Sequence, residues 1–224
     1  MKLSIIIPVY NEDGTVNKII EKVKKLKLSI KKEIIVIDDG STDRSFEIIK
    51  NTSGIKIIRH KKNKGKGATI RTALKYLTGD IIIIQDADLE LNPEEIINVI
   101  NPIIKGKAKV VYGSRNIHKI KEGRQLRFYI GGLLVTWVTN LLYKTKLTDE
   151  PCGYKAFKTE IIRELEINSD GFEWEPEITA KIAKKGIKIY EVPVSYVPRR
   201  EGKKINWKDG IKALWTLIYW RFKK

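Results

Sequence analysis

Short apolar runs alternate with amphipathic stretches along the first half of the chain. Five of these runs have the length and the aliphatic content of buried strands, at 3–9, 33–38, 55–60, 80–85 and 109–114. The stretches between them show helical spacing, and the one at 15–28 places its apolar side chains on one face. Strands that alternate with helices predict an α/β fold, in which a mostly parallel sheet carries helices on both faces.

The second half of the chain has a less regular pattern. We expect a helix around 124–143, a loop over 148–157, a helix around 175–185, a pair of strands within 187–197 and a basic loop at 198–204. The tail places apolar side chains along one helical stripe, which consists of Trp207, Ile211, Leu214, Trp215, Ile218 and Phe222. We therefore divide the chain into one domain, residues 1–204, and a C-terminal amphipathic basic helix, residues 205–224.

Polar residues that directly follow the strands are the candidates for function, because ligands of parallel sheets bind outside the carboxyl ends of the strands. The sequence QDADLE follows the isoleucine run at 81–84. In an extended chain Asp86 and Asp88 point the same way, and their carboxylates repel unless one holds a proton or a cation lies between them. We favour Mg²⁺ or Mn²⁺, completed by the phosphates of a nucleotide, over two solvated loop aspartates.

A second acidic cluster, DDGSTD, follows the strand at 33–38. The carboxylate of Asp39 is placed there to accept hydrogen bonds from a base or a ribose. Ser41 and Asp43 fit the simpler role of a turn and a helix cap.

Several familiar sites are absent from the sequence. The stretch HKKNKGKGAT does not have the P-loop spacing, and no G-x-G-x-x-G follows the first strand. A P-loop ATPase and a dinucleotide-binding dehydrogenase therefore lose their main support. A single cysteine excludes an intrachain disulfide, and two histidines argue against a zinc site or a histidine-based triad.

The composition adds a strong positive charge. Lysine and arginine number 44 against 27 acidic residues, which gives a net charge of +17. Such a balance suggests an anionic partner: nucleic acid, an anionic membrane surface or a phosphate-bearing substrate. We argue against nucleic acid, because basic and aromatic residues are not interleaved on one element and the acidic clusters would repel a phosphate backbone.

Two segments bear on membrane contact. The weakly polar stretch at 128–143 is shorter than the roughly 20 residues of a membrane span, and we interpret it as a core helix in preference to one lying on a membrane. The tail combines Trp207, Trp215 and Trp220 with lysines and arginines in the manner of an interfacial helix. Packing of its apolar stripe on the core is the alternative, and the sequence leaves both interpretations open.

The sequences SIIIPVYNE, IIVIDDGSTD, NKGKGATIRTAL, GDIIIIQDADLE and VVYGSR occur in this order within residues 3–115. Together they resemble the family 2 glycosyltransferases, and more closely the branch of the dolichyl-phosphate mannose and glucose synthases. TDEPCGYKAFK and the region from GFEWEPE to NWKDG extend the likeness over most of the chain. The resemblance implies the GT-A fold, a Rossmann-like three-layer α/β sandwich with a mostly parallel central sheet.

The resemblance also implies roles for individual residues. Those expected at the nucleobase pocket are Pro8, Tyr10, Glu12 and Asp39. Asp86 is expected near the diphosphate and the sugar, Asp88 as a metal ligand, and Glu90, where the family often has glutamine, as the next ligand. Basic contacts to phosphate are expected from Arg115, from Arg124 or Arg127, and from Arg199, Arg200, Lys203 and Lys204.

The expected reaction is the inverting transfer of a hexose from a GDP- or UDP-sugar to a polyprenyl phosphate, with Asp86 and Arg115 at the reacting groups. A phosphate acceptor has a second pKa of about 6, so it needs cations rather than a base. The alternative acceptor is a glycan hydroxyl, which requires a base, and Asp149 is then the candidate. We expect a cytoplasmic protein that is peripheral at the cytoplasmic face of the membrane. The sequence leaves open the sugar and the choice between GDP and UDP.

Overall fold

The computed structural model describes residues 1–117, 125–199 and 202–223. Its strands are β1 (Lys2–Val9), β2 (Lys31–Asp38), β3 (Lys56–Arg59), β4 (Ile81–Ile84), β5 (Val110–Ser114), β6 (Lys155–Lys158) and β7 (Ile189–Pro193). Its helices are α1 (Val16–Lys25), α2 (Ser45–Lys50), α3 (Lys66–Ala73), α4 (Ile96–Ile104), α5 (Leu126–Tyr143), α6 (Thr159–Leu165), α7 (Trp174–Lys184) and α8 (Trp207–Phe222), with a 3₁₀ turn η1 (Pro93–Glu95) before α4.

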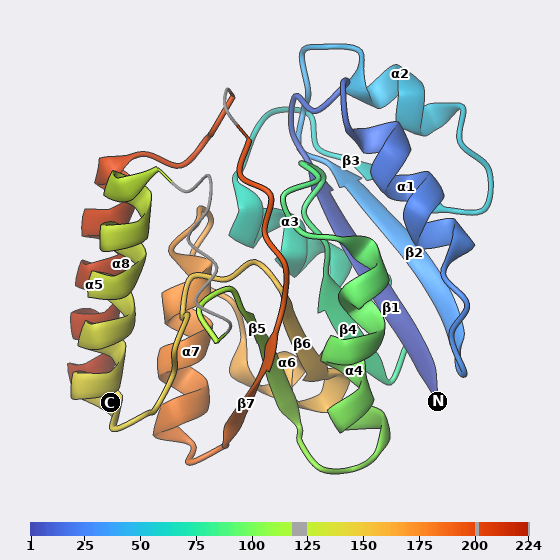
Figure 1. Cartoon of the computed structure of the whole chain (residues 1–224). Coiled ribbons are helices and arrows are strands. Elements are labelled where there is room, and N and C mark those ends of the chain that lie inside the picture. The colour runs from blue at the N-terminus through green and yellow to red at the C-terminus, as the bar shows by residue number, and fades with distance from the viewer. Residues whose placement is uncertain (118–124, 200–201, 224) are drawn as a thin grey trace.

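The strands form one sheet in the order β3-β2-β1-β4-β6-β5-β7 (Figure 1). β1 pairs in parallel with β2 and β4, β2 with β3, and β5 with β7. β6 alone runs antiparallel to its neighbours β4 and β5. The mostly parallel sheet predicted from the sequence is therefore confirmed.

Two sequence predictions for the second half of the chain were wrong. The expected loop over 148–157 contains the start of β6, and α6 follows directly. β6 has only the residues KAFK, whose flanking lysines hide a strand from an apolar-run criterion. The expected pair of strands within 187–197 is the single strand β7.

The four isoleucines of β4 are buried on both faces of the sheet. Ile81 and Ile83 join the apolar core under α1 and α4, whereas Ile82 and Ile84 join the core under α3, α6 and α7. Because successive side chains of a strand point to opposite faces, one short run serves both layers. This sandwiched position fixes β4 and thereby the residues that follow it.

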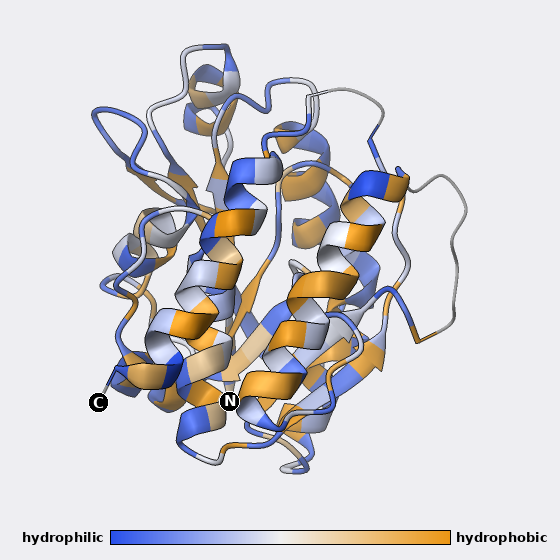
Figure 2. Ribbon diagram, turned by 90° about the vertical axis from the view of Figure 1, so that its left-hand side faces the viewer, coloured by the Kyte–Doolittle hydropathy of each residue, from blue (hydrophilic) through white to orange (hydrophobic). Residues whose placement is uncertain are grey.

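A third apolar cluster joins α5, α7 and α8 outside the main sandwich. Val135, Tyr143, Ala180 and Leu217 are buried in it, and the Tyr143 hydroxyl donates to the main-chain oxygen of Leu217 at 2.6 Å. Figure 2 shows α5 and α8 side by side as the outermost layer on this side. No helix of the described residues is both long enough and apolar enough to cross a membrane.

Glu33 on β2 ties together the amino-terminal edge of the sheet. Its carboxylate accepts hydrogen bonds from Lys2 Nζ at 2.8 Å, Ser4 Oγ at 2.5 Å and the main-chain nitrogen of Thr78 at 2.7 Å. Burial alone would raise the pKa of Glu33, but these hydrogen bonds outweigh it and lower the pKa to about 2. The carboxylate therefore stabilises the fold above a pH of about 4.5, and this contribution is lost as the pH falls through about 2.

We expect Glu33→Gln to lower the free energy of unfolding at pH 7 by about 1 to 2 kcal/mol, because a charged acceptor is replaced by a neutral one and the site still touches solvent. Urea denaturation at several pH values measures this difference, which should shrink between pH 4.5 and pH 2. Glu21→Gln, at a surface pair with Lys24, is the matched control and should change stability little. A difference that stays constant over this pH range would contradict the prediction.

Candidate active site at the carboxyl ends of the strands

The candidate active site lies at the end of the sheet where the parallel strands finish (Figure 1). β2, β1 and β4 are neighbours, so the loops after Val9, Asp38 and Ile84 meet there. Antiparallel β6 begins at the same end, and it brings the loop at 148–154 to it. The segment at 194–206, called here the post-β7 segment, contacts these loops through its described residues at 194–199 and 202–206.

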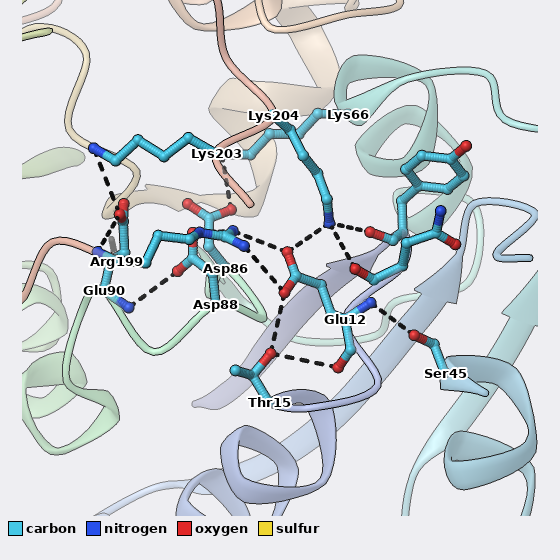
Figure 3. A network of polar contacts seen from close by, with 12 residues as sticks. Glu12, Thr15, Ser45, Lys66, Asp86, Asp88, Glu90, Arg199, Lys203 and Lys204 are labelled. Atoms are coloured by element: carbon cyan, nitrogen blue, oxygen red, sulfur yellow. Dashed lines mark hydrogen bonds and ion pairs between the residues drawn. The ribbon is translucent and has the colours of Figure 1, made fainter. Parts of the chain in front are cut away.

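Arg199 of the post-β7 segment joins two carboxylates from the loops after two different strands. Its Nη2 lies 2.9 Å from Glu12 Oε1 and 2.9 Å from Asp88 Oδ2. Lys204 Nζ lies 2.5 Å from Glu12 Oε1 and also donates to the main-chain oxygen of Tyr10. Figure 3 shows that this network links the loop after β1 to the loop after β4.

Glu90 faces the post-β7 segment rather than Asp88. Its carboxylate accepts from the main-chain nitrogen of Arg199 at 3.0 Å and from the Tyr196 hydroxyl at 3.1 Å. Lys203 Nζ lies 3.6 Å from the same carboxylate (Figure 3). The carboxylate of Glu90 therefore holds the post-β7 segment in place.

Asp86 is paired with a lysine whose side chain is 11% exposed. Lys66, at the start of α3, places Nζ 2.8 Å from Asp86 Oδ1 and 2.9 Å from Glu175 Oε1. Burial would lower the pKa of Lys66, but the two carboxylates raise it above its usual value, so the lysine carries its charge. Gly153 packs against the other carboxylate oxygen of Asp86, where any larger side chain would collide with it. Contacts from two sides therefore fix the Asp86 carboxylate.

Asp88 carries a negative charge that its surroundings only partly compensate. Burial raises its pKa, the nearby charges of Asp86 and Glu90 raise it further, and Arg199 offsets part of this effect, which leaves the pKa at about 6. An additional positive charge at this point would relieve the repulsion.

The residues fit a divalent cation in donor chemistry and in charge, but only as a site of two carboxylates. Among residues 1–117, 125–199 and 202–223, no group of three or more Asp, Glu, His or Cys side chains is arranged to hold a metal. The predicted site of three carboxylates is thus not formed, because Glu90 is turned toward Tyr196 and Arg199. Asp86 and Asp88 remain, and Mg²⁺ is commonly bound by one or two carboxylates completed by substrate phosphates.

Asp39 is engaged within the fold. Its carboxylate lies 2.6 Å from His60 Nδ1 and accepts from the main-chain nitrogens of Lys64 at 3.0 Å and Gly65 at 2.7 Å. These bonds fix the loop between β3 and α3 over the end of β2. Both carboxylate oxygens therefore have partners in the chain. The contact of Asp39 with a nucleobase stays a prediction.

Arg115 and Asp149 form a bidentate pair. The main-chain nitrogen and Nε of Arg115 donate to Asp149 Oδ2 at 2.8 and 2.7 Å, and Nη2 donates to Oδ1 at 2.7 Å. Burial would raise the pKa of Asp149, but the Arg115 guanidinium outweighs it and lowers the pKa below the usual range. Asp149 is only 2% exposed. This arrangement argues against the predicted base and points to a carboxylate that orients Arg115.

A pocket opens beside Arg115, between the first turns of α5 and the post-β7 segment. Arg115, Phe128, Leu133, Tyr196 and Lys203 are among its lining residues. The Arg115 guanidinium and the Lys203 ammonium lie 5.1 and 5.7 Å from the centroid of the Tyr196 ring. Cations and apolar side chains therefore share one pocket, which suits an anionic group that carries an apolar chain.

Other predicted residues contribute less. Pro8 stays within β1, and Tyr10 enters the network through its main-chain oxygen. Arg127 is exposed on α5 and donates to Gln125 Oε1 at 3.2 Å, outside the acidic network. Two predicted arginines lie outside the described residues, Arg124 and Arg200.

The sequence analysis missed Lys66, Glu175 and Tyr196. The available signal was a lysine in the first turn of a helix, where the helix dipole disfavours a cation without an acidic partner. The glycines around Lys66 also have a structural reason. The main-chain nitrogens of Gly67 and Ala68 donate to the loop at 170–171, so the start of α3 packs closely on protein rather than on a phosphate.

The helix-cap role predicted for Ser41 was also wrong. α2 begins at Ser45 with Arg44 at its cap position. The Ser41 hydroxyl instead accepts from the main-chain nitrogen of Asn11 at 3.0 Å. It therefore braces the loop after β1, which carries Glu12.

Comparisons with known proteins give a consistent result. The family model described as glycosyl transferase family 2 matches residues 4–166. The dolichol-phosphate mannosyltransferase of Pyrococcus furiosus is 29% identical over 98% of this chain, which spans 64% of that protein. The UDP-N-acetylglucosamine–dolichyl-phosphate N-acetylglucosaminyltransferase of Methanococcus voltae is 28% identical over 96% of this chain and 94% of its own length.

A solved structure shares the fold. Glucosyl-3-phosphoglycerate synthase from Mycobacterium tuberculosis, crystallised with Mn²⁺, uridine diphosphate and phosphoglyceric acid, superposes with a TM-score of 0.77 at 18% identity. The match covers 100% of this chain and 79% of that one.

Proposed function

The chain belongs to glycosyl transferase family 2, and from this membership we propose that it transfers a hexose, with inversion, from a GDP- or UDP-sugar to a polyprenyl phosphate. The GT-A fold predicted from the sequence is confirmed, and the chain is a glycosyltransferase with relatives named for transfer to dolichyl phosphate. The identities of the sugar, the nucleotide and the acceptor are proposed.

We place the donor at the carboxyl ends of β1 and β4, beside Glu12, Asp86 and Asp88. Asp86 and Asp88 would hold Mg²⁺ or Mn²⁺, which when bound supplies positive charge against the leaving diphosphate. Arg199 and Lys204 now pair with carboxylates of this site. A diphosphate would offer both side chains a more highly charged partner.

The observation that carries the phosphate acceptor is the bidentate Arg115–Asp149 pair at the pocket. A hydroxyl acceptor needs a base, but the Asp149 carboxylate is buried and both of its oxygens accept from Arg115. A phosphate acceptor needs oriented cations, which Arg115 and Lys203 provide at the pocket. The alternative of a glycan hydroxyl with Asp149 as base therefore loses its candidate group.

Nucleotide release from a panel of GDP- and UDP-sugars tests the proposal. The assay is run with Mg²⁺, Mn²⁺ or neither, and with or without a short-chain polyprenyl phosphate. We expect release that depends on both the metal and the lipid phosphate, and the active donor identifies the sugar. Metal-dependent nucleotide binding that lipid phosphate does not stimulate would overturn the acceptor assignment.

Asp149→Asn separates the two acceptor classes. If Asp149 only orients Arg115, we expect about a ten-fold rise in KM for the lipid phosphate and a much smaller change in kcat. If Asp149 is a general base, kcat should fall by about 100-fold or more, with nucleotide affinity unchanged. Steady-state kinetics at saturating donor, together with calorimetric nucleotide binding, distinguish these outcomes.

Peripheral attachment at the cytoplasmic face of the membrane belongs to the same proposal. A polyprenyl phosphate resides in a bilayer, so the enzyme that uses it must reach the bilayer surface. We also propose that the chain consists of one domain, residues 1–204, and a C-terminal amphipathic helix, residues 205–224.

A further inference from the structure

One side of α5 exposes a continuous apolar stripe. Its members recur at helical spacing over almost the whole helix, and they are Leu126, Ile130, Leu133, Leu134, Trp137 and Leu141. The side chain of Trp137, for example, is 61% exposed. The opposite side, with Val135, Thr139 and Tyr143, is buried. The sequence prediction of a core helix is therefore correct for one side of α5 only.

α8 repeats this arrangement. Its exposed apolar side chains are Trp207, Ile211, Trp215, Ile218, Tyr219 and Phe222, and Trp215 is 67% exposed. The buried positions are Thr216 and Leu217. Of the predicted stripe, only Leu214 packs against the third apolar cluster. The other five side chains are exposed, so packing on the core, one of the two alternatives left open by the sequence, is wrong for all of the stripe except Leu214.

The two stripes belong to one face of the molecule. α5 and α8 lie side by side and both begin at the end of the molecule that carries the active site (Figures 1 and 2). Apolar patches of this extent are uncommon on monomeric soluble proteins and usually mark a binding surface. We call this surface the α5/α8 face.

The charges at the edges of the α5/α8 face indicate which kind of partner binds there. The exposed charged residues of α8 and its end are all basic: Lys208, Lys212, Arg221 and Lys223. The one acidic residue of α8, Asp209, is used in a capping box with Asn206. Two copies that met through this face would bring like charges together, whereas an anionic surface would be attracted.

We propose that the α5/α8 face rests on an anionic lipid bilayer, with its apolar side chains at headgroup depth. Helices with an apolar face, interfacial tryptophans and basic flanks bind membranes in this orientation. Neither helix has to span the bilayer for this mode of binding.

The pocket beside Arg115 is continuous with the proposed membrane surface. Leu133 belongs to the exposed stripe and also lines the pocket, together with Arg115 and Lys203. On the premise of the proposed function, an acceptor whose hydrocarbon chain stays in the bilayer can present its phosphate to these cations. The α5/α8 face is then the surface from which the acceptor reaches the pocket.

Vesicle flotation tests the proposal. The full chain is mixed with vesicles of phosphatidylcholine alone or with about 30% phosphatidylglycerol, without donor or metal. We expect clear binding to the anionic vesicles, weaker binding to the neutral ones, and release by high salt. Absence of binding to either kind of vesicle would overturn the proposal.

Two isoleucines of equal exposure supply a matched pair of variants. Ile218 on α8 and Ile97 on α4 are both 42% exposed, and α4 lies away from the α5/α8 face (Figure 1). Ile218→Glu should lower the vesicle partition coefficient about five-fold or more, because it removes apolar contact and adds repulsion. Ile97→Glu should leave it unchanged. Equal loss in both variants would contradict a specific face.

A double variant and a size measurement complete the design. Trp137→Glu with Trp215→Glu should abolish flotation while circular dichroism stays that of the folded protein, since both side chains are exposed. A concentration-dependent dimer in analytical ultracentrifugation that Ile218→Glu dissociates would instead assign the face to a second copy. That result would overturn the membrane assignment.

The experiment separates this inference from the proposed function. Flotation needs neither the sugar donor nor the acceptor, so vesicle binding without any sugar transfer would refute only the proposed reaction. Transfer to a short, water-soluble polyprenyl phosphate should be the same for Ile218→Glu and the wild type. Transfer to a long-chain acceptor in anionic vesicles should fall in parallel with binding. Transfer without vesicle binding would refute only the membrane face.

Discussion

Asp88→Asn is expected to lower kcat/KM for sugar transfer about 1,000-fold, which corresponds to about 4 kcal/mol of transition-state stabilisation. The charge of Asp88 is only partly compensated, and its pKa is raised to about 6 by burial and by Asp86 and Glu90. The asparagine keeps the size and removes the charge that would hold a divalent cation beside the leaving diphosphate.

Binding measurements on the same variant provide a test that does not depend on turnover. Calorimetric titration of nucleotide in Mn²⁺ should show strongly weakened binding, whereas binding without metal should change little. In metal-free buffer at pH 7 the variant should be at least as stable as the wild type. The reason is that a folded-state pKa above the unfolded value of 3.8 means that the charged form costs stability as the pH rises toward 6.

Asp80→Asn is the matched control, because Asp80 precedes the same strand at its opposite end and its side chain is 63% exposed. It should leave metal-dependent nucleotide binding unchanged. Wild-type nucleotide affinity in Mn²⁺ for Asp88→Asn would show that this carboxylate does not hold the cation.

Lys66→Met is expected to destabilise the fold by about 3 to 5 kcal/mol, because it leaves two mostly buried carboxylates without their shared cation. Lys66 Nζ lies within 2.9 Å of both Asp86 and Glu175. For a chain of this size such a loss lowers the melting temperature by about 10 °C. Calorimetry at pH 7 measures this difference.

Lys64→Met, two residues earlier in the loop before α3, provides the comparison. Its side chain is exposed, so its loss should change the melting temperature by no more than about 1 °C. Lys66→Arg keeps the charge and should recover part of the stability lost in Lys66→Met. Equal melting temperatures for Lys66→Met and Lys64→Met would show that the buried cation does not stabilise this site.

Local sequence patterns predicted where the site lies but not how its residues pair. The spacing of Asp86 and Asp88 correctly indicated a charged cluster after a buried strand, because strand position and burial depend on the apolar run itself. Their partners come from α3 and from the post-β7 segment, through Lys66 and Arg199. Nothing near residue 86 encodes these partners, since the sheet topology brings them together.

Asp149 illustrates the same limit for chemistry. A carboxylate in a polar loop is a sound candidate base when its neighbours are unknown. The structure places the loop at 148–154 beside the end of β5, where Arg115 binds both oxygens of the carboxylate. Burial and pairing are tertiary properties, and they decide whether a carboxylate accepts a proton or orients a cation.

The sequence pattern also could not assign which side of α5 and of α8 is exposed. The apolar spacing of α8 left a core helix and an interfacial helix equally open, and the stretch that forms α5 was interpreted as a core helix in preference to one on a membrane. Which side of each helix is covered depends on α7, whose Ala180 shares an apolar cluster with Val135 of α5 and Leu217 of α8. Short β6 was missed for a related reason, because its burial comes from strands β4 and β5 on either side.

The distribution of tryptophan gives the chain an unusual optical signature. Of its five tryptophans, Trp174 is fully buried, Trp220 is half-buried, and Trp137, Trp207 and Trp215 are exposed on the α5/α8 face. Intrinsic fluorescence of the free protein should therefore be dominated by solvated indoles and should respond weakly to unfolding of the core. A blue shift on adding vesicles would report directly on the environment of this one surface, without any attached label.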